Sequence, residues 1–103
     1  MSLEFHPEAL AEFRDAAQYY AGCQEGLEVR FISAVEVVLK RIQQNPQWGK
    51  IFEEEIRWSL TRVFPYAILY SIEPDFIFVI AIMHCHREPG YWRDRLKAKP
   101  RRG

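Results

Sequence analysis

Apolar residues recur at helical intervals twice in the first half of the chain. The spacing of three and four residues predicts helices over residues 7–22 and 25–44. The apolar positions are Ala9, Phe13, Ala16 and Tyr20 in the first helix and Leu27, Phe31, Ala34, Val35, Val38 and Ile42 in the second. Pro7 suits a first helical position, and Pro46 stops the second helix at the residue before it. Two amphipathic helices joined by a few residues form a helical hairpin.

The second half of the chain changes to the patterns of strands. Residues 56–60 alternate between apolar and polar, and residues 64–72 are rich in aromatic and β-branched side chains. Residues 76–85 are almost continuously apolar, which is typical of a central strand covered on both faces. A short strand is expected at residues 3–5, and a last helical turn or two at residues 91–97.

This order of elements predicts an α+β fold. It consists of an N-terminal strand, a two-helix hairpin packed on one face of an antiparallel β-meander, and a short C-terminal helix. A chain of 103 residues is long enough for one domain. We therefore expect a single domain over residues 1–97, followed by a basic tail at residues 98–103.

Composition excludes several classes of protein. Hydrophobic residues make up 49% and aromatic residues 15% of the chain, which excludes a disordered body. The longest apolar run is the eight residues 76–83, whereas a membrane-spanning helix needs about 20. The N-terminus lacks the pattern of a secretory signal, so we expect a cytoplasmic protein. Cys23 and Cys85 are too few for a disulfide framework, and their apolar context predicts core thiols.

Charge is divided unevenly along a chain whose net charge is zero. Residues 1–83 carry 7 Lys and Arg against 12 Asp and Glu, while residues 84–103 carry 7 against 2. The result is −5 for the body and +5 for the C-terminal segment. Such asymmetry indicates an anionic partner, either a nucleic acid or an acidic protein. For residues 99–103 a solvated tail is the simpler interpretation.

Polar residues that could take part in catalysis or binding cluster late in the chain. A His can act as general base or acid, an Arg can hold a phosphate, and a Tyr can stack on a base, so together they meet the needs of a metal-free ribonuclease. The catalytic candidates are His84, His86, Arg87 and Tyr91, and the candidates for target or phosphate binding are Arg57, Arg62, Arg93 and Arg95.

Each of these candidates also has a structural interpretation. The two histidines can simply end a buried strand and face solvent, and Tyr91 and Trp92 can cap the core. A metal site would need a third or fourth ligand beside His84 and His86, and the sequence places none there. No Gly-rich nucleotide loop and no nucleophile-elbow serine is present. We therefore expect no metal and no cofactor.

Several segments in order resemble the RelE/ParE toxin superfamily. They cover residues 4 to about 95. The resembling segments are 8–13 with Ala16, Tyr19 and Tyr20, then 31–42 with Asn45 and Pro46, Arg57, 64–70, and 79–92 with its closing His-Cys-His-Arg-Glu-Pro-Gly-Tyr-Trp. The resemblance implies a small α+β toxin of a bacterial type II toxin–antitoxin pair, of the plasmid-stabilisation kind.

The resemblance also implies partners. A cognate antitoxin would lie across the toxin as an extended or helical segment, giving a hetero-oligomer or, for the toxin alone, a homodimer. ParE-like members inhibit DNA gyrase, and RelE-like members cut mRNA on the ribosome. Ribonuclease members commonly carry an Arg after the aromatic residue of the third strand, where this chain has Ala67 after Tyr66. The sequence therefore favours a ParE-like toxin that binds its target, with the ribosome-dependent endoribonuclease and a non-toxic binding module as alternatives.

Overall fold

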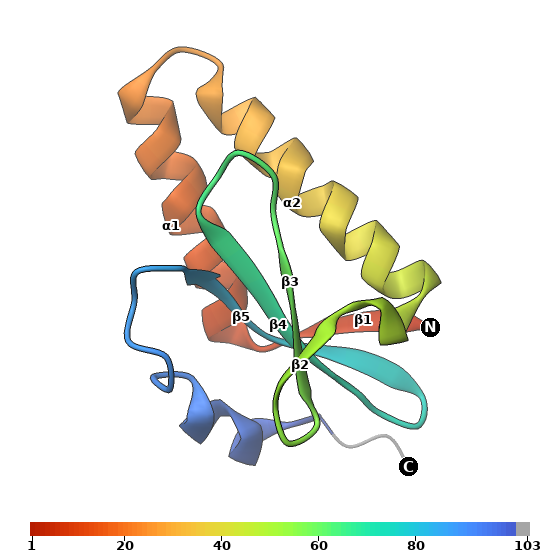
Figure 1. Ribbon diagram of the computed structural model, residues 1–103. Coiled ribbons are helices and arrows are strands. Elements are labelled where there is room, and N and C mark those ends of the chain that lie inside the picture. The colour runs from red at the N-terminus through yellow and green to blue at the C-terminus, as the bar shows by residue number, and fades with distance from the viewer. Residues whose placement is uncertain (101–103) are drawn as a thin grey trace.

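A five-stranded sheet in the order β1-β5-β4-β3-β2 forms the centre of the computed structural model, which describes residues 1–100 (Figure 1). The strands are β1 (Ser2–Phe5), β2 (Lys50–Glu53), β3 (Ile56–Leu60), β4 (Tyr66–Ile72) and β5 (Phe76–His84). β2 to β5 form an antiparallel meander, as predicted. β1 adds to the edge of β5 in parallel.

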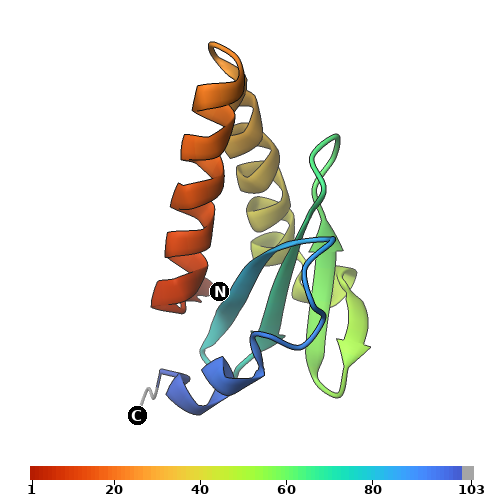
Figure 2. The ribbon, with the colours of Figure 1, turned by 90° about the vertical axis from the view of Figure 1, so that its left-hand side faces the viewer.

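Two helices cover one face of this sheet, which confirms the predicted hairpin (Figure 2). They are α1 (Pro7–Cys23) and α2 (Leu27–Gln44). The α1 N-terminus is capped by His6, whose Nδ1 accepts a hydrogen bond from the backbone N–H of Glu8 at 3.0 Å. Gly26, with φ 82°, supplies the left-handed conformation that lets α2 begin immediately after the turn. Neither helix is long and apolar enough to cross a bilayer within residues 1–100.

The main core lies between the helices and the sheet. Phe31 of α2 is fully buried there, and its ring centroid lies 5.3 Å from that of Phe64 in the β3–β4 turn. Tyr20 of α1 packs against the same Phe64 ring at 4.9 Å. These aromatic contacts join both helices to the far end of the sheet.

A second core covers the opposite face of the sheet. Trp92, 0% exposed, lies here among buried side chains of β4 and β5, together with Leu96 of η2 (Arg93–Ala98). Residues 76–83 of β5 are all buried, which confirms the prediction of a central strand covered on both faces. The C-terminal helix predicted at residues 91–97 is present as the short 3-10 helix η2.

Three features differ from the sequence predictions or add to them. The strand β2 and the 3-10 turn η1 (Pro46–Trp48) were not predicted, because the β2 sequence Lys-Ile-Phe-Glu places its two apolar residues side by side and shows no alternation. Cys23 and Cys85 are both exposed, so the prediction of core thiols is wrong: one ends α1 and the other follows the last residue of β5. The predicted basic tail extends to residues 101–103, which lie outside the described part of the chain.

Candidate functional site

The edge of β5 next to β1 is where the polar side chains converge. β1 pairs with β5 only as far as Phe5 opposite Val79, because α1 begins at Pro7. Two side chains bond to the backbone of β5 beyond that point. Glu12 of α1 accepts a hydrogen bond from the Ile82 N–H at 3.0 Å, and Arg95 of η2 donates one to the Ile80 carbonyl at 3.1 Å. Side chains thus satisfy backbone groups that a longer β1 would have paired.

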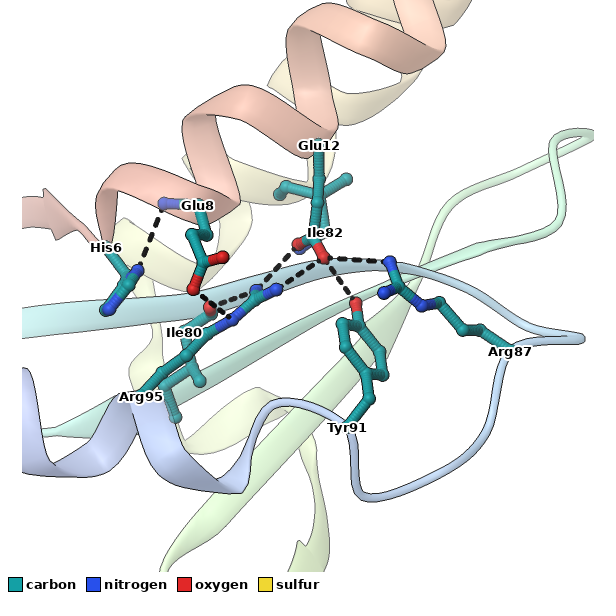
Figure 3. Close-up of polar contacts among 8 residues, drawn as sticks. All are labelled: His6, Glu8, Glu12, Ile80, Ile82, Arg87, Tyr91 and Arg95. Atoms are coloured by element: carbon teal, nitrogen blue, oxygen red, sulfur yellow. Dashed lines mark hydrogen bonds and ion pairs between the residues drawn. The ribbon is translucent and has the colours of Figure 1, made fainter.

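Glu12 collects four further hydrogen bonds (Figure 3). Arg95 donates to both of its carboxylate oxygens, at 2.9 and 2.8 Å, in the bidentate geometry that suits a guanidinium. The Tyr91 hydroxyl donates to Oε2 at 2.7 Å, and Arg87 reaches the same oxygen at 3.5 Å. We call these four residues, Glu12, Arg87, Tyr91 and Arg95, the Glu12 cluster.

Burial strengthens the interactions of this cluster. The side chains of Arg95 and Glu12 are 8% and 13% exposed. Burial alone would lower the pKa of the Arg95 guanidinium, but its hydrogen bonds to Glu12 and the Glu12 charge outweigh burial and raise that pKa. Burial, followed by the hydrogen bond to Glu12, raises the pKa of the Tyr91 hydroxyl. The cluster therefore holds the C-terminal segment against α1 with a charged, bidentate pair.

A hollow of about 300 Å³ borders the Glu12 cluster. Its lining contains two positive side chains, Arg87 and Arg95, and two negative ones, Glu8 and Asp94. Glu8 also lies 3.5 Å from the Arg95 guanidinium. The positive charges that would attract a phosphate are thus offset by neighbouring carboxylates.

The two histidines form a separate pair at the end of β5. The Nδ1 atom of His84 accepts a hydrogen bond from the His86 backbone N–H at 3.1 Å, and the two ring centroids are 5.2 Å apart. The ring of His84 also packs edge-on against Tyr66, at 5.1 Å. His84 is half-buried and His86 is exposed. The link to the Glu12 cluster is through the backbone, since the His84 carbonyl accepts a hydrogen bond from the Arg87 N–H at 3.0 Å.

The remaining candidate arginines lie elsewhere on the molecule. Arg57 donates to the carbonyls of Gln47 and Gly49, at 3.1 and 2.7 Å, and so fixes the turn before β2. Arg93 forms a two-bonded ion pair with Glu53, and Arg62 is exposed in the β3–β4 turn. Glu12 therefore binds Arg87, Tyr91 and Arg95, and it binds none of the other five candidates. Among residues 1–100, no three His, Cys, Asp or Glu side chains are placed to hold a metal ion.

The basic C-terminal segment is largely neutralised within the molecule. Each of its five cations up to residue 100 forms an ion pair with a carboxylate, and four of the carboxylates come from the acidic body. The pairs are Arg87 with Glu12, Arg95 with Glu12 and Glu8, Arg93 with Glu53, Lys97 with Asp94, and Lys99 with Glu73. The charge division seen in the sequence thus has an intramolecular counterpart.

Glu12 is the residue of this site that the sequence analysis did not single out. It lies three residues after Ala9 and four before Ala16, both of which are buried on α1. A carboxylate at that spacing faces the protein interior and needs a cationic partner. The spacing signals such a partner, but it does not identify Arg95.

Comparison with known proteins shows the family to which the chain belongs. Residues 3–89 match the family model described as ParE toxin of type II toxin-antitoxin system, parDE. A solved structure titled "Chromosomal ParDE TA system from P. aeruginosa" contains a chain that superposes with a TM-score of 0.69 at 17% sequence identity, covering 82% of this chain and 95% of that one. At this identity the structural likeness shows the fold. No curated protein matches the chain.

Removing the charge of Glu12 is expected to destabilise the fold. Glu12→Gln leaves the buried Arg95 guanidinium without its main counter-charge, so the free energy of unfolding in urea should fall by about 3 kcal/mol. The matched control is Glu53→Gln, because the Arg93–Glu53 pair is 54% and 37% exposed. That change should cost much less, because solvent screens an exposed ion pair. Equal losses in the two variants would contradict a buried anchoring role for Glu12.

Alkaline pH is expected to weaken the cluster through Tyr91. The pKa of its hydroxyl is higher in the folded state than its ordinary value of 10.0, so this group stabilises the fold fully below pH 10. The contribution is lost as pH rises above 10 through the folded-state pKa. Urea unfolding between pH 8 and 11 should therefore show a smaller decline for Tyr91→Phe than for the unmodified chain. Parallel declines would show that Tyr91 titrates as it does in the unfolded chain.

Proposed function

Because the chain belongs to the ParE toxin family of type II toxin–antitoxin systems, we propose that it inhibits bacterial growth by binding a core macromolecular target and is neutralised by a cognate antitoxin. DNA gyrase is the first candidate target. The site of action would then be the cytoplasm. The proposal gives the polar residues of the C-terminal segment a positioning role rather than a catalytic one.

The engagement of Arg87, Tyr91 and Arg95 by Glu12 is the observation that carries this proposal. Metal-free RNA cleavage needs a general base, a general acid and free donors for the phosphate, all within reach of one substrate. Here the donors of Arg95 and Tyr91 are bonded to a carboxylate inside the protein. The imidazoles that would supply the base and acid contact each other and Tyr66 instead of these donors. The engagement of the phosphate-binding donors by Glu12 supports target binding over RNA cleavage.

Ala67 gives independent support. It is the position at which the resemblance would place an arginine in the ribonucleases. Its side chain is fully buried in the core between the sheet and the C-terminal segment. A phosphate-binding cation has no place there without displacing buried side chains of that core.

An antitoxin segment has a suitable binding surface on the helices. A groove of about 350 Å³ is lined mainly by apolar side chains of α1 and α2: Leu10, Phe13, Arg14, Ala17 and Ile32. Shallow apolar grooves between helices accept the apolar face of an amphipathic segment. We assign this groove to the antitoxin, so that the bound form is a toxin–antitoxin hetero-oligomer.

Pulse-labelling after induction of the chain without antitoxin tests the target. We expect DNA synthesis to stop before protein synthesis, and the double variant His84→Ala/His86→Ala to inhibit growth as strongly as the unmodified chain. If protein synthesis stops first and the double variant loses at least 100-fold in mRNA cleavage, the RelE-like endoribonuclease is the correct function. If neither synthesis stops at high expression, the chain is a non-toxic binding module.

A charge placed in the helical groove tests the antitoxin assignment. Leu10 is 42% exposed, so Leu10→Glu should leave folding and growth inhibition intact while weakening neutralisation by the antitoxin encoded beside this gene. Burying the new carboxylate in an apolar interface should reduce antitoxin affinity at least tenfold. Val37→Glu is the matched control, since Val37 is 51% exposed on α2 and does not line the groove. Equal neutralisation of both variants would place the antitoxin elsewhere.

A further inference from the structure

The β3–β4 turn presents an apolar side chain in an unfavourable backbone conformation. Val63 has φ 73°, in the left-handed region, and is 87% exposed. β-Branched residues rarely adopt this conformation, where Gly or Asn would be unstrained. Because the side chain is almost fully exposed, its packing within the chain does not offset the strain. Strain of this kind persists only where the surrounding structure enforces it, and it is concentrated at functional sites.

The residues on either side of Val63 are anchored. The Thr61 hydroxyl oxygen lies 2.8 Å from the Phe64 carbonyl oxygen and 3.2 Å from that of Tyr66, and the Thr61 N–H donates to Tyr66 at 3.0 Å. Phe64 is buried against the helices. These contacts fix the backbone at both ends of the turn and hold Val63 outward.

Arg62 stands beside Val63 as an exposed cation. Among residues 1–100, no carboxylate lies within ion-pair distance of its guanidinium, whereas the cations of the C-terminal segment up to residue 100 are all paired. Figure 2 shows this turn projecting beyond the rest of the sheet. The tip, residues 61–65, therefore presents one branched apolar group and one free positive charge on a fixed backbone.

Glu54 provides an internal comparison. Within residues 1–100, Glu54 and Val63 are the two non-glycine residues with a positive φ. Glu54, with φ 50°, lies in the β2–β3 turn. Its side chain is charged and exposed, as expected of a turn residue. The two hairpins thus share a backbone feature, but only the β3–β4 tip combines it with an exposed apolar side chain.

We propose that the tip is the contact site for the toxin's protein target, with Val63 entering an apolar pocket and Arg62 pairing with a carboxylate at the pocket rim. The inference rests on the proposed function and adds to it the surface used for the target. No residue of the tip lines the helical groove assigned to the antitoxin, so the two partners use different side chains. A fixed backbone lowers the ordering cost of such a contact.

Three variants of the full chain test this assignment by thermal unfolding and by growth inhibition after induction. Val63→Asn relieves the strain and removes the apolar group, so the melting temperature should rise by about 4 °C while the inducer needed to halve growth rises at least tenfold. Val63→Ile keeps both strain and apolar group and should inhibit growth like the unmodified chain. Glu54→Asn relieves strain at the other hairpin and should raise the melting temperature without changing growth inhibition.

The outcomes separate the tip from the proposed function. If the unmodified chain inhibits growth and Val63→Asn does so equally at equal expression, the tip is not the target contact. If Val63→Asn keeps its toxicity but escapes the antitoxin, the tip belongs to the antitoxin interface, and the assignment is overturned. If the unmodified chain itself leaves growth unaffected, the proposed function fails and this inference fails with it. If an Arg62→Glu variant stays fully toxic, Arg62 does not pair with the target, and that part of the proposed contact is wrong.

Discussion

The fold depends on one buried pair, Glu12 with Arg95, at the edge of β5. The strand is too long for β1 to cover, and the polar groups of its free edge need partners inside the protein. A carboxylate from α1 and a guanidinium from η2 supply them and bind each other at the same time. The pair thus joins the first helix, the central strand and the last helical turn. The second core is held closed by this connection, because Trp92 lies three residues before Arg95.

The spacing of apolar residues was sufficient to predict the elements that are long enough to repeat it. Both helices and the central strand follow from apolar spacing, and the order of elements gave the α+β class. β2 escaped prediction because its two apolar residues are adjacent, so its four residues show no alternation. The exposed cysteines show a related limit, since an apolar neighbourhood in sequence does not bury a residue that ends a helix, as Cys23 does, or follows a strand, as Cys85 does.

The site was harder to predict because its contacts join distant parts of the chain. Arg95 was expected to face a target, yet it is buried against a residue 83 positions earlier. A sequence identifies a charged side chain but not the residue that neutralises it. The acidic body and the basic C-terminal segment are an example, since the opposite charges that suggested an external partner largely meet within residues 1–100. Arg62 is free of such a pair within residues 1–100 and lies beside the strained, exposed Val63, so that turn is more informative about a partner than the richer cluster at residues 84–100.

The order of the elements along the chain has a consequence for biosynthesis. Both helices and all five strands precede Trp92 and Arg95, so synthesis from the N-terminus makes the parts of the helix-side core before the segment that covers the opposite sheet face. Until residues 91–98 have emerged from the ribosome, β5 has one apolar face uncovered, and Glu12 lacks its partner Arg95. A partner protein made at the same time thus has an interval in which to meet the chain before its second core is covered.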